Sequence, residues 1–219
     1  MSSLHVDSVL KNFWNKQVLT DVFIQCNKGE IIGLLGRNGS GKTTLLKIIF
    51  GSLRADNKFI KIASKRLLGL YDARKLINFL PQNGFLPNHL SVRNIISLFC
   101  DKENAEIIRS VPCIQALVGK MSKQLSGGEK RLLEIYLIIF SDAEFILIDE
   151  PFNGVAPVYK EDIKNLIREQ SKNKGFIITD HDYHNIMDVS TRMILLHDGG
   201  TKEINHISDL EYWGYLPRK

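Results

Sequence analysis

The sequence predicts an α/β fold, a mostly parallel sheet flanked by helices, and three observations carry this prediction. Short apolar segments such as Glu30–Leu35, Phe145–Ile148 and Phe176–Thr179 recur along the chain, with helical patterns between them. Uninterrupted apolar runs of four to eight residues are typical of strands that are buried on both faces of a sheet. A glycine-rich loop also joins the first of these runs to a helix, as in strand–loop–helix units.

Composition limits the class of protein. The chain has 219 residues, 44% hydrophobic content and a formal net charge of +5. This length fits one domain over residues 1–219, or one domain with an inserted subdomain, and the apolar content suffices for a core. Neither an apolar stretch of eighteen residues nor a signal peptide is visible, so we expect a cytoplasmic protein with reduced cysteines.

The elements of the first third are mostly strands, interrupted by a helix from Thr44. The expected strands are Leu4–Leu10, Val18–Cys26, Glu30–Leu35, Lys58–Ala63 and Leu76–Leu80. From residue 83 the pattern becomes helical, and Ser91 is placed to cap the first helix. The expected helices are Ser91–Phe99, Glu103–Arg109, Pro112–Gly119 and Lys130–Phe140.

The strand–helix alternation resumes after residue 140. The expected elements are strand Phe145–Ile148, helix Val158–Gln170 after Pro157, strand Phe176–Thr179, helix Tyr183–Met187, and strands Met193–His197 and Thr201–Ile204. We therefore divide the chain into a core of residues 1–82 and 141–219 and a helical insert of residues 83–140.

Residues 36–43 read Gly-Arg-Asn-Gly-Ser-Gly-Lys-Thr, the spacing of a phosphate-binding loop. Glycines let backbone N–H groups converge on phosphate oxygens, and the following helix adds the positive end of its dipole. We expect Lys42 to reach the β- and γ-phosphates and the Thr43 hydroxyl to bind Mg²⁺. A glycine-rich surface turn is the alternative, but the strand before the loop and the helix after it favour the phosphate site.

Two carboxylates, Asp149 and Glu150, end the apolar run Phe145–Ile148. Ligands bind at the carboxyl ends of strands in open α/β sheets, so this position favours function over an ordinary acidic turn. Asp149 can hold Mg²⁺, and Glu150 can orient and deprotonate the water that attacks the γ-phosphate.

A second glycine-rich helix start is Leu125-Ser126-Gly127-Gly128-Glu129. Ser126 and Glu129 fit a capping box, which explains these two residues structurally. Two adjacent glycines at a helix start weaken the helix, so the capping box leaves them unexplained. The pattern predicts a second anion-binding helix N-terminus, on a helix that is apolar nearly all round and therefore buried.

In their order along the chain, these motifs resemble the ATP-binding cassette (ABC) ATPases, specifically the nucleotide-binding subunits of ABC transporters. Gly36–Thr43 resembles the Walker A motif, Leu125–Glu129 the ABC signature and Ile146–Glu150 Walker B with its catalytic glutamate. Gln82 resembles the Q-loop glutamine, and His181 the switch histidine.

The resemblance covers about residues 4 to 205. Within the family, Asp149-Glu150-Pro151-Phe152 followed by Gly154-Val155 is most similar to ATPases of the branched-chain amino acid and lipopolysaccharide export type.

The resemblance implies roles for individual residues. Glu150, His181, Gln82 and Lys42 would be catalytic, and Thr43, Gln82 and Asp149 would bind Mg²⁺. Nucleotide contacts would come from Phe13, Gly36, Asn38, Gly39, Ser40, Gly41, Lys42, Thr43, Thr44, Ser126, Gly127 and Gly128. Phe13 lies where the family carries an aromatic residue that stacks on adenine; it could instead belong to the core, and Trp14 is a weaker candidate for stacking.

The resemblance also implies a P-loop NTPase fold with an N-terminal antiparallel β subdomain and an inserted helical subdomain. The expected function is that of the ATP-binding and ATP-hydrolysing subunit of an ABC transporter. Its partners would be a second copy or a paralogous ATPase subunit, packed head to tail around ATP, and integral membrane permease subunits. The chain would then lie on the cytoplasmic face of a membrane, and the permease would select the cargo.

Two features depart from the family pattern. Ala156 stands where the family usually has an aspartate after the catalytic glutamate, which puts the rate of hydrolysis in doubt. The segment between Gln82 and Leu125 is shorter than expected, so the groove for the permease would be small or reshaped.

Two other functions stay open at this point. One is a soluble ABC-type switch in translation or DNA repair, although such proteins usually carry two cassettes or a long coiled-coil insertion, which we do not find. The other is a weakly hydrolysing nucleotide-binding scaffold, which Ala156 suggests. The helical row of Lys160, Lys164, Arg168 and Lys172 is interpreted as a solvated helix face, so no nucleic acid partner is expected.

Overall fold

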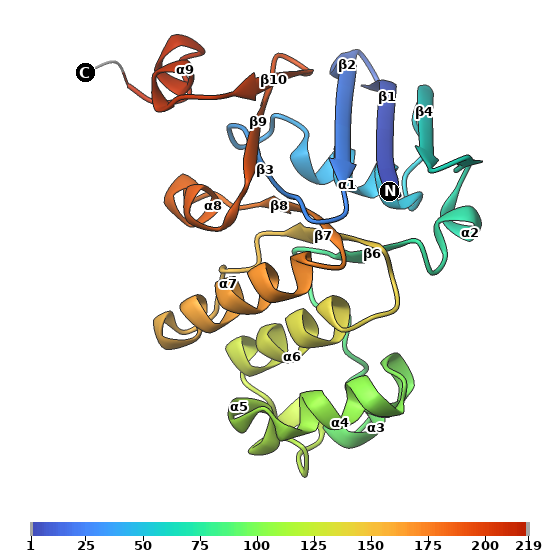
Figure 1. Cartoon of the computed structure of the whole chain (residues 1–219), viewed down its shortest axis with the longest axis vertical. Helices are drawn as coiled ribbons and strands as arrows, with labels where there is room; N and C mark the ends of the chain where they lie inside the picture. Colours follow the sequence, from blue (N-terminus) through green and yellow to red (C-terminus); the bar gives the residue numbers. More distant parts are fainter. Residues whose placement is uncertain (1, 218–219) are drawn as a thin grey trace.

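A ten-stranded sheet runs through the computed structural model, which describes residues 2–217 (Figure 1). The order across the sheet is β5-β4-β1-β2-β10-β9-β3-β8-β7-β6. Its strands are β1 Ser3–Phe13, β2 Lys16–Asn27, β3 Ile31–Leu35, β4 Asn57–Ile62, β5 Lys65–Arg66, β6 Ile77–Leu80, β7 Phe145–Asp149, β8 Gly175–Thr179, β9 Arg192–His197 and β10 Gly200–Ile204.

The two halves of the sheet differ in the direction of strand pairing. Strands β9, β3, β8, β7 and β6 pair in parallel, whereas β1 pairs antiparallel with both β2 and β4. The predicted fold class is therefore confirmed, including its N-terminal antiparallel part. Parallel strands need crossover connections, and helices α7 (Pro157–Ser171) and α8 (Tyr183–Val189) provide those from β7 to β8 and from β8 to β9.

Helices cover the sheet on both faces, and α3 to α6 gather at the end of the molecule remote from β1, β2 and β4 (Figure 1). The helices are α1 Lys42–Phe50, α2 Leu70–Ala73, α3 Val92–Phe99, α4 Lys102–Ser110, α5 Pro112–Gln115, a 3₁₀ turn Ser122–Gln124, α6 Gly127–Ile139, α7 Pro157–Ser171, α8 Tyr183–Val189 and α9 Ile207–Tyr212. Within the described residues, none of these helices combines the length and the apolar character needed to cross a bilayer.

Strand β7 shows why its sequence is apolar without alternation. Phe145 and Leu147 pack into one hydrophobic cluster, with α1 and the antiparallel strands, while Ile146 and Ile148 pack into another, with α3 to α8. Each face of the strand therefore meets a separate core, which is the arrangement expected for a central parallel strand.

Several predicted bounds need correction. Strand β1 extends to Phe13 and forms a long hairpin with β2, because cross-strand pairing continues to Phe13 and Lys16 at the turn. The helix predicted over Pro112–Gly119 ends at Gln115, and the one predicted from Lys130 begins at Gly127. The short elements α2, β5 and α9 were not predicted.

Two further predictions concern the basic residues of α7 and the cysteines. Three members of the basic row on α7 are ion-paired, Lys164 and Arg168 with Asp188 and Lys172 with Glu169. All three cysteines are free, and burial raises the pKa of the Cys26 thiol to about 12.

Gly33 in β3 packs tightly against α8 and the residue that follows it. A Cβ placed there would collide with Cγ2 of Ile186 and lie 3.0 Å from Oγ of Ser190. We expect Gly33→Ala to lower the free energy of unfolding by about 1–3 kcal/mol, because the packed helix must shift. Urea denaturation measures this change. Gly119→Ala is the control, since its Cβ would meet nothing within 4 Å, and equal midpoints for the two variants would contradict the prediction.

Candidate functional site

A cleft of ≈ 680 Å³ opens where β3, β6 and β7 end and where the β1–β2 hairpin turns. It collects most of the residues that the sequence predicted for the site. Its lining is Phe13, Val18, Asn38, Gly39, Gly41, Lys42, Thr43, Thr44, Gln82, Glu150, Asn153 and His181. Residues that are up to 168 positions apart in the chain thus meet at one edge of the sheet.

The phosphate loop between β3 and α1 depends on its glycines. Gly39 and Gly41 have φ angles of 78° and 105°, a region that disfavours side chains, and a Cβ at Gly41 would lie 2.8 Å from Cγ1 of Val18. Gly41 caps α1 without any side-chain hydrogen bond, so the first N–H groups of α1 stay available for an anion. The Ser40 hydroxyl is shielded from solvent and has no protein partner.

Lys42 is nearly buried in this loop. Its ammonium donates to the carbonyl oxygens of Gly36 at 2.6 Å and Arg37 at 3.3 Å. Burial lowers the pKa of Lys42 from its ordinary value, and the carboxylates of Asp149, Glu150 and Asp180 oppose this effect. Since a charge-assisted bond is stronger than one to a neutral carbonyl, an anionic phosphate would be a better partner for this ammonium.

Asp149 at the end of β7 joins the loop to the sheet. Its Oδ2 accepts from the Thr43 hydroxyl at 2.7 Å, and its Oδ1 accepts from the Thr179 hydroxyl at 2.6 Å. The carboxylate is buried, with 1% of the residue exposed, so these two bonds compensate part of its desolvation. The hydroxyl of Thr43 and the carboxylate of Asp149 are oxygen donors of the kind that Mg²⁺ prefers.

Glu150 follows in a strained backbone conformation, with a φ angle of 52°. Its carboxylate oxygen Oε2 accepts from Nε2 of Gln82 at 2.9 Å and from Nδ2 of Asn153 at 3.3 Å. Both amides hold the same oxygen, and neither hydrogen-bonds to Oε1, the second oxygen of the carboxylate.

Asp180 and His181 follow β8 on the other side of the cleft. Asp180 is fully buried, burial raises the pKa of its carboxyl group, and its Oδ2 has no hydrogen-bond partner. The imidazole of His181 is 59% exposed, and its Nδ1 lies 3.4 Å from Oδ1 of Asp180. His181 therefore stands at the mouth of the cleft, open to solvent.

Phe13 ends β1 and lines the cleft, with 40% of the residue exposed, so it is not a core residue. The ammonium of Lys11 lies 4.9 Å from the centre of its ring. Trp14, at the hairpin turn, is fully exposed and does not line the cleft, which leaves Phe13 as the candidate for stacking.

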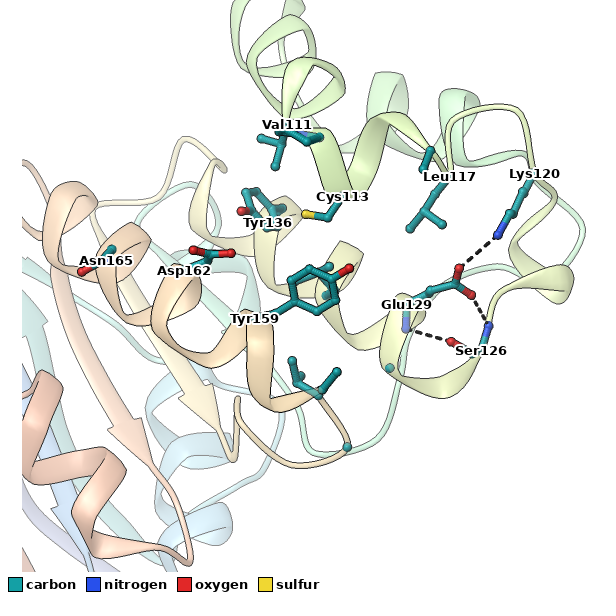
Figure 2. A pocket seen from close by; sticks show the side chains of 17 residues that line it. Val111, Cys113, Leu117, Lys120, Ser126, Glu129, Tyr136, Tyr159, Asp162 and Asn165 are labelled. Atoms are coloured by element: carbon teal, nitrogen blue, oxygen red, sulfur yellow. Dashed lines mark hydrogen bonds and ion pairs between the residues drawn. The ribbon is translucent and has the colours of Figure 1, made fainter.

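The second glycine-rich helix start lies outside this cleft. Ser126 and Gly128 line a separate cavity of ≈ 1180 Å³ between α5, α6 and α7 (Figure 2). The capping box is present: the Ser126 hydroxyl accepts from the N–H of Glu129 at 3.2 Å, and the Glu129 carboxylate accepts from the N–H of Ser126 at 2.7 Å. Lys120 pairs with the same carboxylate at 3.0 Å.

The structure explains why residue 128 is a glycine, which the sequence did not reveal. A Cβ there would lie 2.9 Å from the carbonyl oxygen of Gly154, so the start of α6 packs directly against the loop after Glu150. A Cβ at Gly127 would meet nothing within 4 Å, so packing within the chain does not explain that glycine.

Sequence reasoning missed several residues of the site. Asn153 gave no signal, because a single asparagine in a turn is common. Arg131 and Glu134 gave one that was overlooked, since they are the two charged residues, three positions apart, in the buried stretch of α6 from Arg131 to Ile139. Arg131 donates to the main chain of Glu150, as described below.

Ala156 is the N-cap of α7, which begins at Pro157. A methyl group accepts no hydrogen bond, so the first turn of α7 has no side-chain cap. Ala156 therefore leaves the N-terminal N–H groups of α7 without a side-chain acceptor.

The chain matches the family model described as "ABC transporter" over residues 19–153. It is 32% identical to the lipopolysaccharide export system ATP-binding protein LptB of Haemophilus influenzae and 34% identical to that of Escherichia coli, in each case over 91% of this chain and 88% of the relative. A probable ABC transporter ATP-binding protein of Azorhizobium caulinodans is 31% identical over 90% of this chain and 75% of the relative.

Solved structures support the same fold. The ATP-binding subunit of an ABC transporter superposes with a TM-score of 0.84 at 23% identity, covering 99% of this chain and 95% of that chain. A nucleotide-free ATP-binding cassette from an ABC transporter gives 0.81 at 24% identity, covering 99% and 96%. At these identities the likeness concerns the fold alone.

Ala156→Asp is expected to raise the free energy of unfolding by about 1 kcal/mol, because the carboxylate would accept from a free N–H of α7 at the positive end of its dipole. Chemical denaturation measures the change. Ala156→Asn tests the cap without the charge, and Ala156→Leu supplies a side chain that cannot cap. Equal stability of the Asp and Leu variants would refute the assignment of Ala156 as an uncapped helix start.

Proposed function

The chain belongs to the ABC transporter family as an ATP-binding and ATP-hydrolysing subunit, and from this premise we propose that it drives a membrane permease by closing around ATP with a second ATPase subunit. One observation carries the proposal. The phosphate loop and the catalytic carboxylate share one cleft, whereas Ser126 and Gly128 of the signature line a separate cavity of the same chain.

This separation favours a site completed by another subunit. Ser126 and Gly127 are exposed at the N-terminal end of α6. The capping box occupies the N–H groups of Ser126 and Glu129, so the N–H groups of Gly127 and Gly128, together with the helix dipole, would favour an anion. Within one chain they do not line the cleft that holds Lys42. A second copy or a paralogous subunit, packed head to tail, would bring its signature onto the γ-phosphate. ATP would then hold the two subunits together, and loss of the γ-phosphate would release them.

In the proposed site the phosphate loop binds the triphosphate. Backbone N–H groups of the loop and the start of α1 would meet its oxygens, with Lys42 exchanging the Gly36 carbonyl for the β- and γ-phosphates. The residues assigned to this cradle are Gly36, Asn38, Gly39, Ser40, Gly41, Lys42, Thr43 and Thr44. The ring of Phe13, at the edge of the cleft, would stack on adenine.

The oxygen donors of Thr43, Asp149 and Gln82 fit Mg²⁺, since they combine a hydroxyl, a carboxylate and an amide carbonyl at one edge of the sheet. Mg²⁺, when bound, neutralises charge on the β- and γ-phosphates. For Gln82 this requires its amide oxygen, which stays available while Nε2 donates to Glu150.

Glu150 is proposed as the general base that accepts the proton of the attacking water. Its Oε2 is held by Gln82 and Asn153, which leaves Oε1 to face that water. His181, exposed at the cleft mouth, is proposed to turn toward the γ-phosphate when the cleft is filled.

Contact with the membrane would be indirect. We propose that permease subunits dock on the helical insert, residues 83–140, and on the Gln82 loop, while residues 1–82 and 141–219 form the catalytic core. Through this docking the chain would lie on the cytoplasmic face of the membrane. The named relatives favour this function over a soluble switch in translation or DNA repair.

A weakly hydrolysing scaffold is the second candidate function, and Ala156 is the observation that favours it. Phosphate release by the chain purified together with its permease separates the two candidates. Sustained turnover that ends when ATP is exhausted supports the transporter ATPase, and saturable ATP binding without turnover supports the scaffold.

Glu150→Gln is expected to keep ATP binding and to reduce kcat by at least about 10²-fold, because the amide cannot accept the proton. It should also trap an ATP-bound dimer, detectable by size-exclusion chromatography with light scattering. A variant that hydrolyses ATP at the parent rate would show that Glu150 is not the base.

Phe13→Ala is expected to raise KM for ATP by roughly 5- to 150-fold, the equivalent of about 1–3 kcal/mol of base stacking, with little change in kcat. Phe13→Tyr should keep the parent KM. Trp14→Ala is the matched control, since that neighbouring ring is fully exposed outside the cleft. If the Phe13 and Trp14 variants have the same KM, adenine does not stack on Phe13.

A further inference from the structure

Helix α6 carries a buried ion pair that no motif accounts for. Arg131 and Glu134 are 7% and 2% exposed, and Nη1 of the guanidinium lies 3.6 Å from Oε2 of the carboxylate. Burial of two charges is costly even when they are paired, and well-packed apolar residues would often serve a helix equally well. The hydrogen bonds of Arg131 and Glu134 show which parts of the main chain the ion pair fixes.

Besides its ion pair with Glu134, Arg131 donates to three main-chain carbonyls at the ends of the two strands beside it. Nη1 donates to the carbonyl of Pro81 at 2.7 Å, and Nη2 to those of Asp149 at 2.6 Å and Glu150 at 3.0 Å. A guanidinium is planar and its donors are fixed relative to one another, so the three carbonyls are held in one arrangement. This arrangement sets Pro81, the residue before Gln82, against Asp149, which ends β7, and Glu150, which follows it.

Glu134 holds the same loop at a second point. Its Oε1 accepts from the N–H of Phe85 at 2.8 Å, and a Cβ at Gly84 would lie 2.8 Å from that oxygen. The ion pair therefore fixes the chain on both sides of Gln82. Gln82 in turn donates from Nε2 to the Glu150 carboxylate at 2.9 Å.

The backbone of Glu150 needs such support. A φ angle of 52° is unfavourable for a residue with a side chain and persists only where the surroundings impose it. The N–H of Glu150 donates to the Thr179 carbonyl at 3.0 Å, and Arg131 binds the carbonyl on each side of that strained residue. Arg131 thus holds the backbone that aims the carboxylate into the cleft.

We propose that Arg131 and Glu134 are positioning residues for ATP hydrolysis, which fix Gln82 and the Glu150 carboxylate in one geometry and tie it to the signature helix. This proposal rests on the proposed function. Arg131 lies four residues after Gly127, about one helical turn from the start of α6. A displacement of that helix start, where another subunit's γ-phosphate would bind, therefore moves the guanidinium and the catalytic backbone together.

The test replaces both charges at once, because removal of one alone leaves the other buried and unpaired. In the double variant Arg131→Met/Glu134→Gln, the glutamine still accepts from the N–H of Phe85, while the carbonyls of Pro81, Asp149 and Glu150 lose their donor. We expect a folded protein with KM for ATP within about threefold of the parent and kcat at least about tenfold lower, the signature of a group needed only in the transition state.

The matched control is Arg168→Met/Glu161→Gln on α7. It makes the same two substitutions in an ion pair with an N–O distance of 3.1 Å, but one that is 37% and 61% exposed. Its kcat is expected to equal that of the parent. Arg131→Lys keeps the charge without the planar fork, so its kcat should lie between those of the parent and the double variant, with KM unchanged.

If the double variant folds and its kcat equals that of the parent, the proposal is overturned. If the double variant fails to fold, Arg131→Lys decides, and a folded Arg131→Lys protein with parent kcat overturns the proposal equally. These outcomes leave the proposed function standing as long as the parent hydrolyses ATP and Glu150→Gln does not. A parent that binds ATP without hydrolysing it overturns both proposals.

Discussion

The parallel pairing of β3, β8, β7 and β6 is the constraint on which the whole site depends. In a parallel sheet the carboxyl ends of neighbouring strands meet at one edge, and the register here places Asp149 opposite Thr179 and Leu80 opposite Ile148. Each loop that leaves this edge therefore starts a few ångströms from the next. The phosphate loop, Gln82, Glu150 and His181 meet for this reason, although three helical stretches separate them in sequence.

The same edge concentrates buried charge. Lys42, Asp149 and Asp180 are each less than a tenth exposed, as are Arg131 and Glu134 on the helix beneath. Charges removed from water are tolerated only where hydrogen bonds or opposite charges replace their hydration. Main-chain carbonyls satisfy Lys42 and Arg131, and hydroxyls satisfy Asp149. These hydrogen bonds place the charged groups before any ligand arrives, and such preorganisation lowers the reorganisation that catalysis requires.

The loop between β7 and α7 connects two parts of the molecule. Ala156 leaves α7 uncapped, while three residues earlier Asn153 donates to Glu150. The carbonyl oxygen of Gly154 lies so close to Gly128 that a Cβ at position 128 would be 2.9 Å from it. This loop therefore touches both the Glu150 carboxylate and the start of α6, so a change in either can reach the other through a few atoms.

The sequence by itself determined the fold class, the order of the longer elements and most of the cleft. Local patterns were sufficient there: an apolar run predicts a buried strand, and glycines before Lys42 and Thr43 predict a phosphate loop, because both depend on residues adjacent in the chain. The roles of individual residues such as Gln82 and His181 came from resemblance, since a single glutamine or histidine has no local signature.

Only the tertiary structure decided which groups, far apart in the sequence, hydrogen-bond to one another or to the same atom. That Gln82 and Asn153 hold the same oxygen of Glu150, and that Arg131 binds the carbonyls of Pro81 and Asp149, follows from strand register and helix packing. Side-chain patterns along one chain do not encode these contacts, because a main-chain carbonyl is present at every residue and its partner is chosen by geometry alone.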